Sequence, residues 1–215
     1  MFLLLFGANF SLYFLFLRKE WRAVYKDEEL RLYGVVIFGS IAFISVLVWL
    51  EGMLPLVQSV HHSAFTVASV ISTAGFVTVD FGLWPQATRE VLLLLVIMGP
   101  VTGSTGGGIK MSRLLILGKN IKTGLYRMLH PRSVKTISVN GKALPEEVLQ
   151  GVNLYFGVSA VGVALYFVFG SLDGFYMATN LSAVLSCRNN IWPGFGQVGP
   201  STRSAHYAYV SKIIL

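Results

Sequence analysis

Ser72-Thr73-Ala74-Gly75-Phe76 and Gly103-Ser104-Thr105-Gly106-Gly107-Gly108-Ile109-Lys110 are two polar, glycine-containing stretches that interrupt long apolar runs. Hydrocarbon holds no water to bond bare backbone N–H and C=O groups. Irregular backbone at membrane depth therefore survives only inside protein or beside a water-filled path. Two such breaks in one hydrophobic hairpin predict a pore or a transport pathway.

The composition is that of a membrane protein. The 215 residues are 54% hydrophobic and only 13% charged, about half the charged share of a soluble domain. We therefore expect an all-α integral membrane protein with lipid around it. The single cysteine, Cys187, excludes an intrachain disulfide, and nothing indicates haem, a Cys-ligated metal or another cofactor.

The net charge of +7 is concentrated in two segments. Five basic residues lie between Arg18 and Arg31 and eight between Lys110 and Lys142. Basic loops between apolar spans are typical of the cytoplasmic side of multi-pass proteins. This distribution argues against nucleic-acid binding and predicts that both segments face the cytoplasm.

The apolar pattern repeats one arrangement twice: a span, a short re-entrant helix, a glycine-containing return and a second span. Both copies start in the cytoplasm, so they are parallel membrane-pore-membrane repeats. We expect a preceding span with a cytoplasmic linker (1–31), one repeat (32–118), a cytoplasmic loop (119–147) and a second repeat that stops before its last span crosses (148–215).

Particular segments carry this layout. Met1–Leu17 is apolar with its basic flank after it, the opposite of a signal peptide, and is predicted as a span. His62–Ile71 is too short to cross and is predicted as a re-entrant helix, with Ser72–Thr78 as its extended return. Asn140-Gly141 predicts a hairpin turn within Val134–Leu144. The further predicted spans are Leu32–Leu50, Val91–Gly118 with its interruption, and Val148–Gly170; Gly174–Cys187 is the second short segment.

The Ser72–Phe76 stretch fits a cation filter. Backbone carbonyls replace the hydration shell of potassium in narrow pores, and glycine reaches the dihedrals that aim successive carbonyls inward. Gly75 suits that role, and Thr73 and Thr78 add hydroxyl oxygens or brace the strand. The alternative is a tight turn at the end of a buried helix.

The Gly103–Lys110 stretch resembles a nucleotide-binding Walker A loop, but Ile109 separates Gly108 from Lys110 and no strand precedes it. We interpret it as a flexible loop that crosses the pathway; a helix kink is the alternative. Lys110 and Arg113 are expected to extend to the cytoplasmic headgroups. His61 and His62 have no acidic cluster nearby and are not expected to bind metal.

Together these motifs resemble the TrkH/KtrB/HKT superfamily of potassium transporters, and most closely its bacterial TrkH branch. The resemblance rests on Ile71–Pro85, Gly103–Lys110, His130-Pro131-Arg132, Val139–Lys142, Asn189-Asn190-Ile191 and the linker Lys26–Glu29. It implies that the chain holds the third repeat and most of the fourth of four around one pore.

What the resemblance implies for function is potassium uptake across the cell (inner) membrane, with no enzymatic activity. It also implies a homodimer and a cytoplasmic, nucleotide-binding TrkA-like regulatory subunit. The implied filter is Thr73, Ala74, Gly75, Phe76, Asn190, Ile191, Trp192 and Pro193, with K⁺ held at Thr73, Ala74, Gly75, Asn190 and Ile191. The implied gating loop is Gly103, Ser104, Thr105, Gly106, Gly107 and Gly108.

Three features depart from the family pattern. Trp192 stands where the family has glycine, Arg188 where it has an apolar residue and where it would place a cation beside the ion path, and half of the pore is absent. The alternative function is thus a non-conducting fragment or degraded paralogue that acts as a membrane scaffold. A small-solute carrier would need a polar pocket beyond the two breaks.

Overall fold

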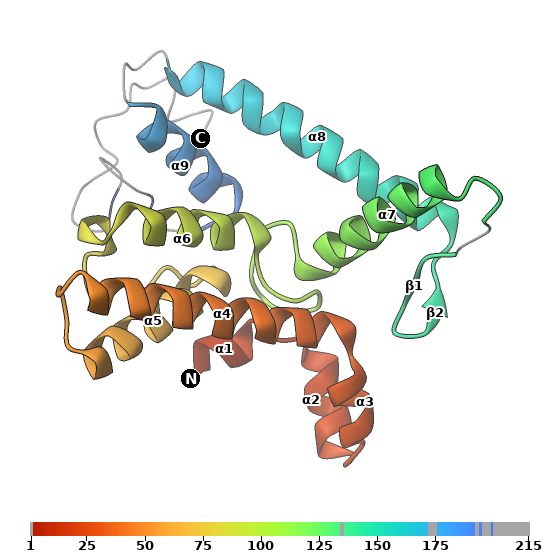
Figure 1. Cartoon of the computed structure of the whole chain (residues 1–215), viewed down its shortest axis with the longest axis horizontal. Helices are drawn as coiled ribbons and strands as arrows, with labels where there is room; N and C mark the ends of the chain where they lie inside the picture. The colour runs from red at the N-terminus through yellow and green to blue at the C-terminus, as the bar shows by residue number, and fades with distance from the viewer. Residues whose placement is uncertain (1, 134–135, 172–175, 192–193, 195–198, 200–215) are drawn as a thin grey trace.

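The computed structural model describes residues 2–133, 136–171, 176–191, 194 and 199, and these are mostly helical, as the composition predicts (Figure 1). The helices are α1 (Phe2–Phe6), α2 (Phe10–Leu17), α3 (Trp21–Lys26), α4 (Glu28–Leu50), α5 (Leu56–Ile71), α6 (Gln86–Met98), α7 (Met111–Leu129), α8 (Glu146–Gly170) and α9 (Met177–Arg188). A short 3-10 helix, η1 (Phe81–Leu83), and two strands, β1 (Ser138–Val139) and β2 (Lys142–Ala143), complete the described elements.

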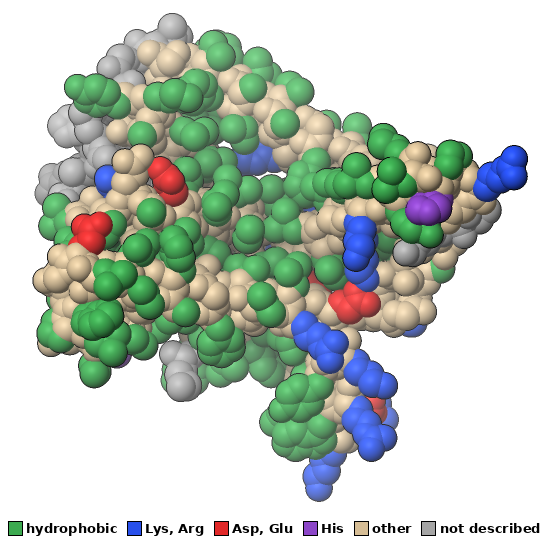
Figure 2. Space-filling view, in the orientation of Figure 1, with side chains coloured by type: hydrophobic (Ala, Val, Ile, Leu, Met, Phe, Trp, Pro, Cys, Tyr) green, Lys and Arg blue, Asp and Glu red, His purple; other side chains and the backbone are tan. Residues whose placement is uncertain are grey.

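Among the described residues, α4 and α8 are the two helices long and apolar enough to cross a membrane. Both expose large apolar side chains, such as Phe38 on α4 and Leu154 on α8. Figure 2 shows hydrophobic side chains over much of the helical surface, whereas Lys and Arg gather around α2, α3 and the end of α7. Apolar surface of this extent suits contact with lipid rather than water.

Helix α4 begins four residues earlier than the predicted span. The Asp27 side chain caps it by accepting a hydrogen bond from the Leu30 N–H at 2.8 Å, and Glu28 and Glu29 in the first turn suit the positive end of the helix dipole. The helix ends at Leu50, where Gly52 takes a left-handed conformation (φ 67°). Glu28 and Glu29 of the predicted linker are therefore part of the helix, and Asp27 is its cap.

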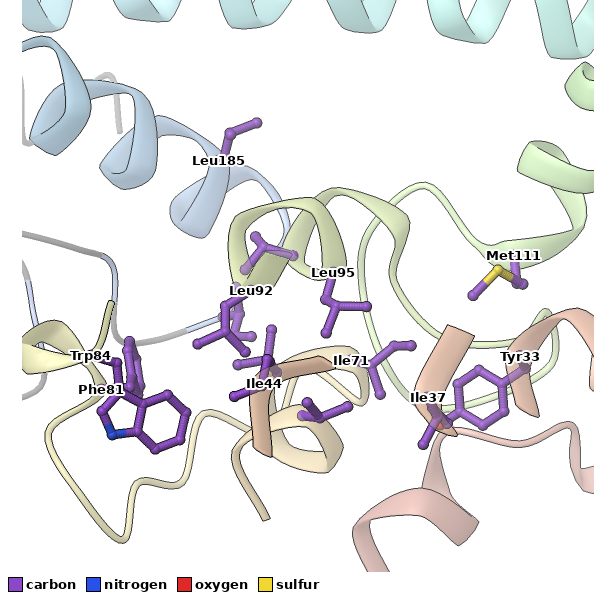
Figure 3. Packing of buried hydrophobic residues seen from close by; sticks show 14 of the residues in the cluster. Tyr33, Ile37, Ile44, Ile71, Phe81, Trp84, Leu92, Leu95, Met111 and Leu185 are labelled. Carbon is purple, nitrogen blue, oxygen red and sulfur yellow. The ribbon is translucent and has the colours of Figure 1, made fainter. Parts of the chain in front are cut away.

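Helix α5 packs against both α4 and α6, and α9 lies between α6 and α8 (Figure 1). The core that joins them includes Ile44 from α4, Ile71 from α5, Leu92 and Leu95 from α6 and Leu185 from α9 (Figure 3). With 16 residues α5 is about 24 Å long, shorter than the hydrocarbon core of about 30 Å. It starts at Leu56, directly after Pro55, six residues before the predicted start.

The predicted span over Met1–Leu17 is not one continuous helix. The segment forms two helices, α1 and α2, separated at Gly7–Asn9. A Cβ on Gly7 would lie 2.1 Å from the Tyr33 hydroxyl oxygen of α4, and the Asn9 side chain caps α2 by accepting from the Ser11 N–H at 2.8 Å. Close packing at a glycine and a new helix cap together break the apolar run.

The predicted turn at Asn140-Gly141 is confirmed. Both residues have positive φ, 52° and 76°, as a two-residue hairpin turn requires. The strands pair antiparallel with Ser138 opposite Ala143 and Val139 opposite Lys142. The hairpin connects α7, which runs on to Leu129, with α8.

Candidate functional site

The end of α5 leads into the first predicted filter segment through a specific cap. The Thr73 N–H donates to the Val70 carbonyl at 3.1 Å and the Ala74 N–H to the Ser69 carbonyl at 3.0 Å. This pair of bonds is a Schellman motif, and its left-handed residue is usually glycine. Here it is Thr73 (φ 56°), a β-branched residue for which that conformation is a genuine outlier.

Gly75, two residues further on, also has positive φ (75°), while Ala74 does not. The stretch Thr73–Phe76 is therefore neither helix nor regular strand. Phe76 is exposed, and the Thr78 hydroxyl is 3.3 Å from the His62 Nδ1. The Thr78 hydroxyl, which we expected to line the pathway or to brace the strand, is thus hydrogen-bonded to His62 of α5.

The end of α9 carries the same cap. The Asn190 N–H donates to the Cys187 carbonyl at 3.2 Å and the Ile191 N–H to the Ser186 carbonyl at 2.9 Å. Asn190 is left-handed (φ 53°) like Thr73. Hydrogen bonds and dihedrals therefore align Asn189-Asn190-Ile191 with Ser72-Thr73-Ala74. Trp192 and Pro193, the rest of the second predicted segment, lie outside the described residues.

The stretch from Gly99 to Lys110 separates α6 from α7. It descends toward α4 and α1 before it returns to α7 (Figure 1). The Met111 N–H donates to the Pro100 carbonyl at 2.9 Å, so the start and the end of the loop are held together. Four of its residues, Gly99, Gly103, Gly108 and Lys110, have positive φ between 70° and 84°.

The glycines of this loop lie between the caps of α5 and α9. The Gly107 N–H donates to the Thr73 hydroxyl oxygen at 3.0 Å. A Cβ on Gly106 would lie 2.8 Å from the Ser72 carbonyl oxygen, and one on Gly107 would lie 2.5 Å from the Asn189 carbonyl oxygen. The structure thus brings Thr73, Gly106, Gly107 and Asn189 together, and only glycine permits such close backbone approach.

Two basic residues that we expected at the headgroups bind the loop instead. The Lys110 ammonium donates to the Ser104 carbonyl at 3.3 Å and to the Gly106 carbonyl. The Arg113 guanidinium donates to the Ile109 carbonyl at 3.0 Å and lies over the Tyr155 ring of α8, 4.2 Å from its centre. These cations thus satisfy carbonyls that the broken helix leaves without helical partners.

The N-terminal break contacts the loop from another side. The Val101 N–H donates to the Gly7 carbonyl at 3.0 Å and the Phe10 N–H to the Gly103 carbonyl at 3.4 Å. The Asn9 side chain fills the space that a Cβ on Gly103 would need. Sequence reasoning missed this contact, although Gly7 and Asn9 in an apolar run were the signal for it.

Glu29 is a second residue that sequence reasoning missed. Its carboxylate accepts a hydrogen bond from the Thr102 N–H at 2.7 Å, and the residue is only 9% exposed. The loop is therefore held by the α1–α2 break, the start of α4 and the ends of α5 and α9.

Arg188 extends toward α8. Its guanidinium donates to the Ser159 hydroxyl at 2.6 Å and to the Ser159 carbonyl at 3.3 Å. The cation is thus paired with neutral oxygens of a neighbouring helix. No cluster of His, Cys, Asp or Glu that could hold a metal ion occurs within the described part of the chain.

Broken helices that meet around a glycine loop, among helices with exposed apolar faces, are an arrangement typical of membrane transport proteins. A family model for TrkH, described as a cation transport protein, matches residues 32–215. The chain belongs to this TrkH family.

Two relatives and one solved structure illustrate the similarity. The chain is 33% identical over 201 residues to the Trk system potassium uptake protein TrkG of Escherichia coli K12, covering 93% of this chain and 41% of the relative. It is 34% identical over 211 residues to TrkH of Vibrio parahaemolyticus, covering 92% and 41%. The crystal structure of the potassium transporter TrkH from Vibrio parahaemolyticus matches with a TM-score of 0.87 and 30% identity, over 100% of this chain and 46% of that one.

The chain spans less than half the length of these relatives. They are transport proteins rather than enzymes, as the sequence analysis expected for this chain. Family and fold together establish a helical membrane protein.

Proposed function

We propose that the chain contributes half of a potassium uptake pathway in the cell (inner) membrane. K⁺ is held by main-chain oxygens of the segments Thr73–Phe76 and Asn190–Pro193. The loop Gly103–Gly108 controls its passage, and no resident cofactor takes part. The observation that carries the proposal is the contact of Gly106 and Gly107 with both helix caps, at Ser72, Thr73 and Asn189.

The backbone conformation supports a filter. In an extended strand successive residues face opposite sides, so a regular strand cannot point consecutive carbonyls at one ion. Positive φ at Thr73 and Gly75 departs from that geometry and lets neighbouring carbonyls face a common axis. Carbonyl oxygens in such an array replace the hydration shell of potassium.

The matching caps of α5 and α9 support the proposed repeat layout. In the proposal α5 and α9 are re-entrant pore helices of two parallel membrane-pore-membrane repeats, residues 32–118 and 148–215. Residues 1–31 are the end of a preceding repeat with its linker, and 119–147 form a cytoplasmic loop. Both basic segments face the cytoplasm, in keeping with the excess of Lys and Arg there.

Two repeats cannot encircle an ion, so the proposal requires further chain. We place this sequence in a full-length transporter that forms a homodimer and that a cytoplasmic, nucleotide-binding TrkA-like subunit regulates. The names of the relatives, Trk system potassium uptake proteins, support K⁺ as the transported ion.

The test is ion preference in the full-length protein. Gly75→Ser places a side chain where φ is 75°, at a cost of about 1–2 kcal/mol. We expect a lower ratio of rubidium to sodium uptake in proteoliposomes. Gly39→Ser on α4, where nothing lies within 4 Å of an added Cβ, is the matched control. An unchanged ratio in Gly75→Ser would contradict the proposed filter.

A non-conducting scaffold is the second candidate, and a specific observation favours it. The cap alignment places Trp192 one residue after Ile191, as Gly75 is one residue after Ala74. A bulky residue therefore stands at the second repeat's equivalent of a left-handed glycine. The substitution Trp192→Gly in the full-length protein distinguishes the filter from the scaffold. Increased rubidium uptake supports a filter that Trp192 impedes. If neither the unchanged protein nor Trp192→Gly takes up rubidium although both are present in the membrane, the scaffold is supported.

A further inference from the structure

Three consecutive acidic residues at the start of α4 together bind the loop, α7 and the hairpin. Glu29 accepts from the Thr102 N–H of the loop at 2.7 Å. Glu28 forms an ion pair with Lys119 of α7, whose ammonium also donates to the Ser138 carbonyl of β1 at 2.7 Å. These contacts connect loop, helix and hairpin through one turn of α4.

Asp27 completes the connection. One of its oxygens caps α4 at the Leu30 N–H, and the other accepts from the Asn140 Nδ2 at 2.8 Å. The Asn140 Oδ1 in turn accepts from the Glu28 N–H at 2.8 Å. The hairpin turn is therefore hydrogen-bonded to the start of α4 through both the oxygen and the nitrogen of the Asn140 side-chain amide.

The hairpin turn places Asn140 next to α4 in a left-handed conformation (φ 52°), and its amide is held there by the bonds to Asp27 and Glu28. Glu28 and Glu29 are adjacent in the same helical turn. A shift of the hairpin that pulls on Glu28 therefore moves Glu29, and Glu29 holds the backbone of the loop at Thr102. The bond lies at the edge of the packed interior, because Glu29 is only 9% exposed whereas Thr102 is exposed.

We propose that Glu29 is a positioning residue that couples the cytoplasmic hairpin to the intramembrane loop. Displacing Asn140 from Asp27 and Glu28 releases the loop from its position against the caps of α5 and α9. This inference rests on the proposed function, which makes the loop a gate, but the coupling itself is a property of contacts that need no ion flux.

The experiment measures loop exposure directly. In the full-length protein in liposomes, Cys187 and any other native cysteine are replaced by serine, and the half-buried Ser104 becomes the reporter Ser104→Cys. The readout is its rate of modification by a charged methanethiosulfonate reagent. Asn140→Ala is introduced with Glu29 intact, with Glu29→Ala, and with Glu29→Gln, which keeps a side-chain oxygen as acceptor.

We expect Asn140→Ala to raise the modification rate about ten-fold with Glu29 intact, equivalent to 1.4 kcal/mol. With Glu29→Ala the rate is already high, so Asn140→Ala adds less than about two-fold, the non-additivity of coupled sites. Glu29→Gln restores most of the response. If Glu29 had a purely structural role, Asn140→Ala would raise the modification rate by the same factor with Glu29 intact, with Glu29→Ala and with Glu29→Gln. That result would overturn the coupling.

Asn120→Ala is the matched control. Asn120 donates to the Asn153 side chain at 3.1 Å, and this bond joins α7 to α8. It is expected to leave the modification rate unchanged, and a ten-fold rise there would also overturn the proposal. Rubidium uptake is measured in parallel. If the effect of Asn140→Ala on the modification rate depends on Glu29 but the protein takes up no rubidium, the proposed function alone is contradicted. If the protein takes up rubidium but that effect does not depend on Glu29, this inference alone is contradicted.

Discussion

Gly107→Ala is the sharpest perturbation of the loop. Gly107 does not have positive φ, so alanine fits its backbone conformation and adds only a methyl group. That methyl carbon would lie 2.5 Å from the Asn189 carbonyl oxygen and 3.2 Å from its carbon. Gly103 and Gly108 are poorer probes, because their left-handed conformations would add strain of another origin.

The magnitude follows from what the methyl group meets. The contact is almost 1 Å too short for ordinary packing, and the neighbour is backbone of the α9 cap, which cannot rotate aside. Overpacking of this kind costs about 1–3 kcal/mol. If the loop relieves this overpacking by moving away from the caps of α5 and α9, the ratio of open to closed loop rises about 5- to 150-fold.

The assay is resting rubidium uptake by the full-length protein in proteoliposomes, normalised to the amount of folded protein. Gly118→Ala on α7 is the control, because nothing lies within 4 Å of an added Cβ there. We expect uptake to rise at least five-fold in Gly107→Ala and to remain unchanged in Gly118→Ala. Unchanged or reduced uptake in folded Gly107→Ala would refute the idea that contact of the loop with the caps of α5 and α9 closes the pathway.

Three further substitutions test individual structural contacts. Ser159→Ala removes the 2.6 Å acceptor of the half-buried Arg188; we expect a loss of about 1–3 kcal/mol, seen as a lower unfolding temperature in detergent. Gly141→Val places a β-branched residue at φ 76° at a cost of about 1–2 kcal/mol, so the amide of Leu144, which donates to Ile137 across the hairpin, should exchange its hydrogen faster. Gly124→Ala fills open space on α7 and should stabilise the helix by up to about 1 kcal/mol, raising the unfolding temperature.

Local patterns in the sequence were sufficient for the elements that local chemistry determines. Long apolar runs predicted α4 and α8, and Asn140-Gly141 predicted the hairpin turn because few other pairs tolerate two left-handed residues. The start of α5 was predicted late, although Pro55 before Leu56 is a recognised helix-start signal.

The contacts that hold the loop could not be predicted in the same way. Glu29 and Thr102 are 73 positions apart, and an acidic residue in the first turn of a helix is already accounted for by the helix dipole. Lys110 likewise had an adequate local explanation as a headgroup contact. In both cases the deciding partner is a backbone group exposed by a break elsewhere, which only the packed structure identifies.

The role of the glycines changes most between sequence and structure. Three glycines in succession predicted mobility, yet Gly106 and Gly107 lie closely against backbone of Ser72 and Asn189, and Gly108 lies against Gly99. Absence of a Cβ here permits close packing, and the bond from the Gly107 N–H to Thr73 exploits it. If the loop is the gate that we propose, it opens when specific hydrogen bonds break, such as that from the Gly107 N–H to Thr73. Its position should therefore respond to residues such as Glu29 and Lys110, whose charged groups hold loop backbone at Thr102, Ser104 and Gly106.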